Sequence, residues 1–163
     1  MSNADIARIF EEVADLLEIQ DGSPFRIRAY RAAARTIAAL GESAAELVQR
    51  EGAEALLELP GVGKDLAGKI VEIITTGELP LLKELTATIP EGLVEVMRLP
   101  SLGPKRAHLL HEALGISTVD ELEEAARSGR LLEVRGFGEK LVATILEACE
   151  KRKARAGRVP LAQ

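Results

Sequence analysis

The sequence contains few of the residues on which several common kinds of binding site depend. Cys149 is its single cysteine, so the chain can form no internal disulfide and no zinc site built on cysteines. Aromatic residues make up 2% of the chain and tryptophan is absent, which argues against binding of single strands by base stacking. His108 and His111 have the spacing of a metal-binding pair, but the sequence has no further histidine to complete a zinc site. We interpret both histidines as surface or boundary residues.

Long apolar stretches are also missing. No window approaches the roughly 18 uncharged apolar residues of a membrane helix, and the start of the chain lacks the basic and apolar pattern of a signal peptide. With 47% hydrophobic and 29% charged residues, the 163-residue chain can bury one core or two small ones. These features favour a soluble protein in a reducing, cytoplasmic compartment. Cys149 lies at helical spacing from Ile145 and is expected to be a small core residue.

One short motif is written three times in this sequence. The copies are residues 59–67 (LPGVGKDLA), 99–107 (LPSLGPKRA) and 134–142 (VRGFGEKLV), called hairpins one, two and three below. Each consists of a Gly-apolar-Gly turn, with Ser101 in place of the first glycine in the middle copy, and the start of an amphipathic helix. Such a turn leaves backbone N–H groups unpaired at a helix N-terminus, where they can bind a phosphate oxygen. The repeat predicts a helix-hairpin-helix protein that binds a nucleic-acid backbone.

The expected phosphate contacts come from these hairpins and from basic side chains near them. In the hairpins the candidates are Gly61, Val62, Gly63 and Lys64, then Leu102, Gly103, Lys105 and Arg106, then Gly136, Phe137, Gly138 and Lys140. A second group, Arg26, Arg28, Arg31 and Arg35, occupies residues 23–40, a segment without acidic residues. Arg28, Arg31 and Arg35 have the spacing of one helix face, and this arginine face is either a patch that contacts phosphate or simply a solvated helix face. If Ser101 requires a positive φ, it is strained, and hairpin two could then serve a structural purpose.

The charge balance favours a different class of protein. The net charge of −5 opposes binding to a polyanion, and residues 5–21 are strongly acidic. A protein-interaction or purely structural repeat is therefore an alternative. The tail at residues 151–158 is wholly basic among its charged residues. It is either an extension, a DNA contact, or a helix end that favours cations.

The apolar spacing is helical along nearly the whole chain. Helices are expected over residues 6–17, 24–40, 44–48, 53–59, 64–76, between the prolines at 80 and 90, and over 91–98, 105–114, 119–128 and 139–155. Thr118 and Glu121 have the spacing of a capping box. No segment alternates convincingly with period two. We therefore predict an all-α protein without a sheet, made of two small helical subdomains at residues 1–85 and 86–163.

Residues 23–33 (SPFRIRAYRAA), the first hairpin, Lys69-Ile70 and Thr76-Gly77 closely resemble the N-terminal part of bacterial X-family DNA polymerases. The resemblance extends over about residues 5–160 and includes the small lyase-type domain and the fingers region. The polymerase palm motifs, including the Asp-x-Asp that binds two metal ions, are absent, so we expect no polymerase activity from this chain alone. The resemblance implies a monomer at the bacterial nucleoid that functions in base excision repair. It would bind gapped DNA, nicked DNA or 5′-phosphate ends without base specificity.

The same resemblance implies a possible 5′-deoxyribose-phosphate lyase, in which Lys69 forms a Schiff base and Tyr30 supports the site. This chemistry needs an uncharged amine. Asp65 lies four residues before Lys69 and would hold it charged. The alternatives are a solvated Lys69 paired with Asp65 or Glu72, and a Tyr30 that belongs to the core. The resemblance also implies a sodium or potassium ion, bound with DNA by backbone carbonyls. These would be the carbonyls of Leu57, Leu59 and Val62, and of Met97, Leu99 and Leu102.

Overall fold

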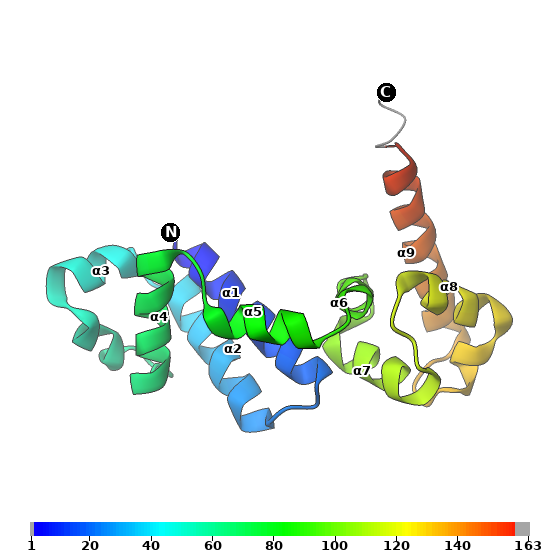
Figure 1. The fold of residues 1–163 in the computed structure, drawn as a ribbon, viewed down its shortest axis with the longest axis horizontal. Coiled ribbons are helices and arrows are strands. Elements are labelled where there is room, and N and C mark those ends of the chain that lie inside the picture. The colour runs from blue at the N-terminus through cyan, green and yellow to red at the C-terminus, as the bar shows by residue number, and fades with distance from the viewer. Residues whose placement is uncertain (1, 159–163) are drawn as a thin grey trace. The chain divides into compact units, whose positions relative to one another are not determined.

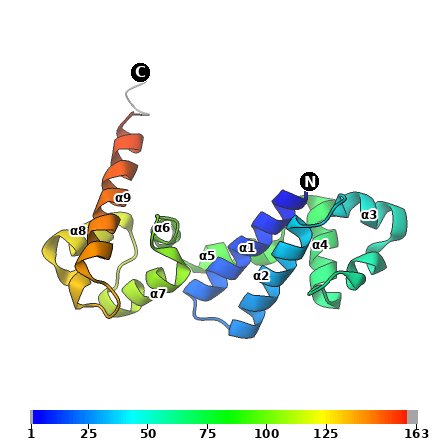
Figure 2. The same cartoon turned by 180° about the vertical axis from the view of Figure 1, so that it is seen from behind.

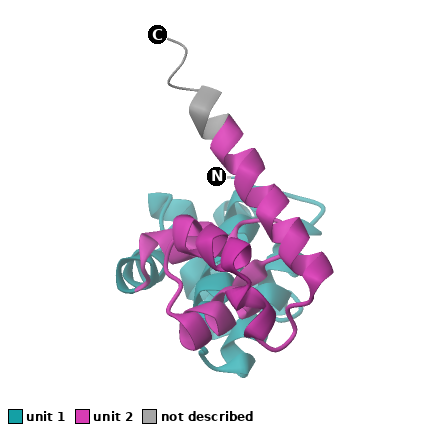
Figure 3. Cartoon of the chain, turned by 90° about the vertical axis from the view of Figure 1, so that its right-hand side faces the viewer, with its two compact units in different colours: residues 1–88 teal, residues 89–163 magenta. Residues whose placement is uncertain are grey.

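The computed structural model describes residues 2–158, with side chains up to residue 154. Over these residues the chain is helical and contains no strand, which confirms the all-α prediction. The chain divides into two compact units, residues 1–88 and residues 89–163 (Figure 3). No helix among the described residues is both long enough and apolar enough to cross a membrane.

Unit 1 contains the helices α1 (Asn3–Ile19), α2 (Pro24–Ala38), α3 (Ala44–Glu51), η1 (Ala53–Glu58), α4 (Lys64–Thr76) and α5 (Pro80–Thr88). The first two form a hairpin and lie side by side along their length (Figure 1 and Figure 2). Their core contains the fully buried Ile6, Phe10 and Val13 of α1 and Ile37 of α2. The ring of Phe10 meets that of Tyr30 edge-on, with centroids 5.6 Å apart. This packing buries Tyr30 in the core.

Polar side chains hold the start of the first helix. The hydroxyl of Ser2 accepts a bond from the Asp5 N–H, and the Asp5 carboxylate accepts one from the Ser2 N–H, which makes a capping box. Asn3 donates to the Glu42 carbonyl and accepts from the Ala44 N–H, both at 2.8 Å. These bonds tie the start of α1 to the start of α3.

Unit 2 contains α6 (Glu91–Met97), α7 (Gly103–Leu114), α8 (Val119–Ser128), η2 (Arg130–Glu133) and α9 (Glu139–Arg158). Its core is built from Leu93, Val96, Leu110, Leu122, Leu131, Ile145 and Cys149. Cys149 is fully buried, which confirms its expected place in the core. Gly92 marks a close approach of α6 to the segment before α8, because a Cβ at this position would collide with the Ser117 carbonyl oxygen.

Three local features differ from the expectations. The helix expected at residues 53–59 is the 3₁₀ helix η1, and residues 130–133, which lie outside the expected helices, form the 3₁₀ helix η2. At the start of α8, Thr118 caps the N–H of Glu121. The Glu121 carboxylate, however, accepts from the N–H of Ser117 and not from that of Thr118, so the predicted capping box is displaced by one residue.

Candidate nucleic-acid interface

The three hairpin segments form the same backbone turn. The N–H of the fourth residue donates to the carbonyl of the first, from Val62 to Leu59, from Leu102 to Leu99 and from Phe137 to Val134, at 3.1, 3.2 and 3.1 Å. The apolar residue that ends each turn is buried, whereas the third residue of each turn is exposed. The buried residue therefore fixes the turn against its unit and leaves the tip of the turn at the surface.

The third residue of each turn has a left-handed backbone. Its φ is +79° at Gly61, +73° at Ser101 and +92° at Gly136. Left-handed φ at this position is typical of a type II turn, where glycine is favoured because it has no Cβ. Ser101 thus has the positive φ that the sequence analysis considered, and it is strained. The turn of hairpin two nevertheless keeps the same hydrogen bond as the other two.

Hairpin two differs at the second glycine. Gly63 is extended, with φ −94°, and α4 begins immediately after it. The corresponding Gly103 has φ +82°, and α7 begins at this residue. Relative to the helix that follows, the Leu102–Gly103 peptide therefore has a different orientation from the Val62–Gly63 peptide. Pro104, the next residue, also has no N–H to donate. Hairpins one and three offer a fuller set of amides at the helix start.

Each hairpin has at least one exposed basic side chain beside it. Lys64, Lys105, Arg106 and Lys140 are exposed. The guanidinium of Arg106 donates to the Ser101 carbonyl at 2.8 Å, so this side chain folds back over its own turn. Exposed lysines beside helix N-termini place mobile positive charge where unpaired N–H groups already favour an anion.

The second helix supports hairpin one directly. The hydroxyl of Thr36 donates to the Pro60 carbonyl at 2.7 Å, and a Cβ at Gly61 would lie 3.5 Å from the Ala32 side chain. Arg28 and Arg35 are four residues before and three residues after Ala32, which places both on the same side of α2. Both are exposed. The helix spacing therefore places two arginines on the face of α2 that contacts hairpin one.

Arg31 does not fit the predicted acid-free arginine face. Its guanidinium bonds to the carboxylates of Glu11, Asp15 and Glu18 at 2.9, 3.0 and 2.6 Å. The segment around Arg31 has no acids, but the neighbouring helix α1 supplies three. Burial raises the pKa of Asp15, although Arg31 opposes this shift. Arg31 therefore joins α1 to α2, and its charge is already compensated.

Lys69 of α4 is held by an acid on its own helix. Its Nζ donates to both carboxylate oxygens of Asp65 at 2.9 and 3.0 Å, which confirms the predicted pairing. Burial lowers the pKa of Lys69, but the bond to Asp65 and the neighbouring Tyr30 outweigh it and leave the pKa raised. Tyr30 is 3% exposed. The amine is thus charged at neutral pH, which is unfavourable for a nucleophile.

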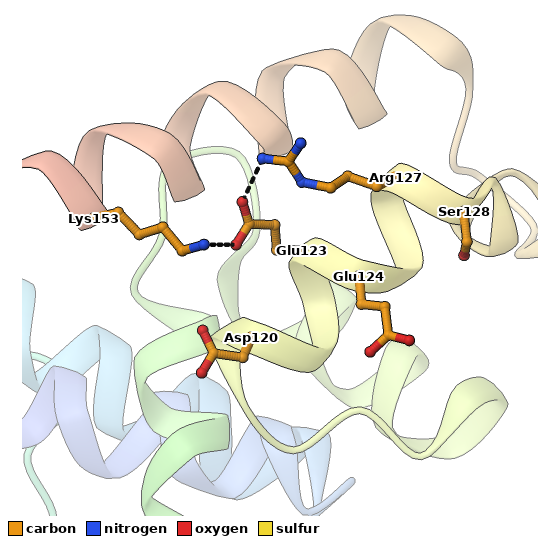
Figure 4. Close-up of a pocket in the computed structure, with 6 residues that line it drawn as sticks. All are labelled: Asp120, Glu123, Glu124, Arg127, Ser128 and Lys153. Carbon is orange, nitrogen blue, oxygen red and sulfur yellow. Dashed lines mark hydrogen bonds and ion pairs between the residues drawn. The ribbon is translucent and has the colours of Figure 1, made fainter.

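Among the described residues of the basic segment in α9, Arg152 and Lys153 form ion pairs within unit 2. Arg152 bonds to Glu95 of α6 at 2.6 Å, and Lys153 bonds to the buried Glu123 of α8 at 2.7 Å. Arg127 donates to the same carboxylate at 2.7 Å, beside a shallow depression on α8 and α9 (Figure 4). Residues 155–158, the rest of the predicted basic tail, lie outside the described side chains. Arg152 and Lys153 fasten α9 to the rest of the unit.

Metal-binding side chains do not gather into a site among the described residues. They contain no group of three or more His, Cys, Asp or Glu side chains that could hold a metal ion. The Nδ1 of His111 lies 3.1 Å from the Ile116 carbonyl, which ties the end of α7 to the segment after it. His111 therefore has a structural partner.

One surface residue was missed by the sequence analysis. Phe25, in the first turn of α2, is 75% exposed and is one of the few large apolar side chains at the surface of the described chain. The adjacent Arg26 is also exposed. The sequence could have indicated that Phe25 is exposed, because it precedes two arginines in the first turn of a capped helix, where a core residue is not expected.

Three hairpins in an all-helical chain define a tandem helix-hairpin-helix protein. Residues 1–79 match the family described as a helix-hairpin-helix domain, and residues 93–151 match the SAM-like helix-hairpin-helix tandem. Over 161 residues the chain is 31% identical to the DNA polymerase/3'-5' exonuclease PolX of Bacillus subtilis (strain 168). The match covers 99% of this chain and 27% of that protein, so the chain spans about a quarter of the relative's length. The chain thus resembles the N-terminal part of an X-family DNA polymerase, as its motifs predicted.

Proposed function

We propose that this chain binds DNA through backbone phosphates, without reading the base sequence, as the DNA-binding part of an X-family polymerase. The observation that carries the proposal is the repeated turn, which exposes helix N-termini beside basic side chains in both units. Backbone amides and lysines contact phosphate and sugar, which carry no sequence information. The relative in Bacillus subtilis adds support, since it is a DNA polymerase and such an enzyme acts on DNA. Such a chain would act as a monomer at the bacterial nucleoid.

The preferred DNA is proposed to be a gapped or nicked duplex. Hairpin one, Arg28 and Arg35 would contact the backbone on one side of the discontinuity, and the hairpins of unit 2 would contact the other side. Phe25 supports this preference, because an exposed ring beside arginines can stack on a base that a gap leaves uncovered. An intact duplex offers no such base.

A sodium or potassium ion at hairpin one is part of the proposal. The carbonyl oxygens of Leu57, Leu59 and Val62 are hard donors of the kind that alkali ions accept. The Leu59 oxygen already accepts the Val62 N–H, but a carbonyl oxygen has a second lone pair. The ion would add positive charge beside a phosphate. In hairpin two the corresponding oxygens are those of Met97, Leu99 and Leu102. The peptide that carries the Leu102 oxygen has a different orientation relative to the helix that follows, so the ion is proposed for hairpin one first.

The glycines that follow the turns allow a test that spares the fold. Gly63 and Gly138 do not have positive φ, and a Cβ at either position would meet nothing within 4 Å. Replacing both with alanine should leave folding intact while the new methyl groups hinder the approach of a phosphate. We expect affinity for gapped duplex to fall about tenfold, or about 1.4 kcal/mol. Gly68→Ala is the matched control, because Gly68 also has open space around it and lies on α4 beyond the hairpin.

The assay is a fluorescence titration with one-nucleotide-gapped duplex and with intact duplex at two salt concentrations. Tighter, salt-dependent binding to the gap, weakened by the double alanine variant and not by Gly68→Ala, is the expected result. Equal affinity of the double variant and the wild type would exclude hairpins one and three as the contact. Absence of binding even at low salt would favour a protein-interaction repeat. Borohydride trapping on an abasic 5′ end tests the lyase alternative, and we expect no adduct because Asp65 keeps Lys69 protonated.

A further inference from the structure

Hairpin one has an acid where the other two hairpins have a lysine. The second residue after the second glycine of the turn is Asp65 in hairpin one, Lys105 in hairpin two and Lys140 in hairpin three. Asp65 therefore puts negative charge in the first turn of α4, next to amides that would otherwise attract an anion. The other two copies of the motif carry a positive charge at this position.

Hairpin one also has a lysine that the other hairpins lack. Lys69 corresponds to Leu109 in hairpin two and to Thr144 in hairpin three. Both carboxylate oxygens of Asp65 accept bonds from Lys69, at 2.9 and 3.0 Å. The Asp65 side chain is 81% exposed and that of Lys69 is 21% exposed. The carboxylate thus covers the ammonium on its solvent side, and an anion from solution meets Asp65 first.

The fold itself gains little from this arrangement. An ion pair between residues four apart on an exposed helix contributes little to stability. Its effect on a bound phosphate is greater, because the single negative charge of Asp65 offsets the positive charge of Lys69 and leaves the pair without net charge. A terminal phosphate monoester carries close to two negative charges at neutral pH, whereas an internal phosphodiester carries one. Asp65 therefore repels a terminal phosphate more strongly than an internal one.

We propose that Asp65 sets the DNA-end specificity of hairpin one. Its ion pair with Lys69 prevents preferential binding of a terminal 5′-phosphate. This proposal rests on the proposed DNA binding and narrows it. Hairpin one would contact the continuous backbone, and a 5′-phosphate at the gap would add little affinity. Asp65 is a specificity-determining residue in this account, and it need not touch the DNA.

The test compares gapped duplexes that carry either a 5′-phosphate or a 5′-hydroxyl at the gap. The proteins are the wild type, Asp65→Asn, and the double variant Asp65→Asn with Lys69→Gln. Glu72→Gln is the control, because it removes the same charge from an exposed position of the same helix. We expect the two affinities of the wild type and of Glu72→Gln to agree within about twofold. Asp65→Asn should prefer the 5′-phosphate by about fivefold or more, and Lys69→Gln should abolish this gain.

Each result of this test has a definite meaning. A wild type that already prefers the 5′-phosphate several-fold would overturn the proposal. So would an Asp65→Asn variant that binds gapped DNA with an unchanged ratio of the two affinities. A gain shared by Glu72→Gln would assign the effect to overall charge and would also overturn it. If no variant binds either duplex at low salt, both this proposal and the proposed DNA binding fail.

Discussion

The left-handed serine of hairpin two provides a sharp test of the turn geometry. Ser101 has φ +73°, while Gly61 and Gly136 hold the same place in the other hairpins at +79° and +92°. A left-handed backbone costs a residue with a Cβ about 1–2 kcal/mol. Ser101→Gly removes this cost but adds about 0.4–1 kcal/mol of backbone entropy to the unfolded state. Ser101 is exposed, and its hydroxyl makes none of the hydrogen bonds identified among the described residues, so no such bond is lost.

The expected net effect is a stabilisation of about 0.5–1 kcal/mol, equivalent to a rise in Tm of a few degrees for a unit of this size. Gly136→Ser is the reverse change in the same unit, at a position where a Cβ meets nothing within 4 Å. It should lower stability by a similar amount. The measurement is urea and thermal unfolding of the two variants and the wild type, followed by circular dichroism. Loss of stability in Ser101→Gly would refute the reasoning, since it would mean that the serine side chain contributes more than its strained backbone costs.

The remaining predictions concern an ion-pair cluster in each unit and one exposed arginine. The bonds from Lys153 and Arg127 lower the pKa of Glu123 below its usual 4.5, so its stabilising contribution is present above that pH and is lost as the pH falls through the lowered value. Glu123→Gln should therefore flatten the fall in the Tm of unit 2 during acidification from about pH 7 to about pH 3, measured by thermal scans. Arg31→Gln leaves three carboxylates of α1 without their cation and should destabilise unit 1 by about 1–3 kcal/mol in urea unfolding. Arg35→Gln, at an exposed position, should leave stability within about 0.5 kcal/mol but weaken DNA binding, and the opposite pattern for these two arginines would contradict their assignment.

Features that depend on local sequence were predicted well. The helix at residues 64–76 has the predicted bounds, because Gly63 starts it and Gly77 ends it with a left-handed φ of +81°. The Gly-apolar-Gly turns before the helices were also predicted, and the structure adds that they are type II turns whose last apolar residue is buried. Short 3₁₀ segments were harder, since their apolar spacing over four to six residues does not distinguish a helix from a turn.

Features that depend on the pairing of helices could not be predicted in the same way. The role of Arg31 is set by the register of α1 against α2, which brings three acids to a segment that has none of its own. The ion pairs of Arg152 and Lys153 depend similarly on how α9 packs on α6 and α8. The backbone of Gly103 is a further case, because glycine permits both signs of φ and the motif does not select one.

The net charge of −5 is a weak guide to partners in this chain, because the structure separates charge that is compensated from charge that is available. Part of the acidic excess of α1 surrounds Arg31, and two cations of α9 are bound to acids of unit 2. The proposed contacts are backbone amides with a few lysines and arginines beside them. The salt dependence of binding reports the phosphates neutralised by cations, not the total number of contacts. Binding of gapped DNA by this chain should therefore depend on salt less steeply than binding by a lysine-rich patch with the same number of phosphate contacts.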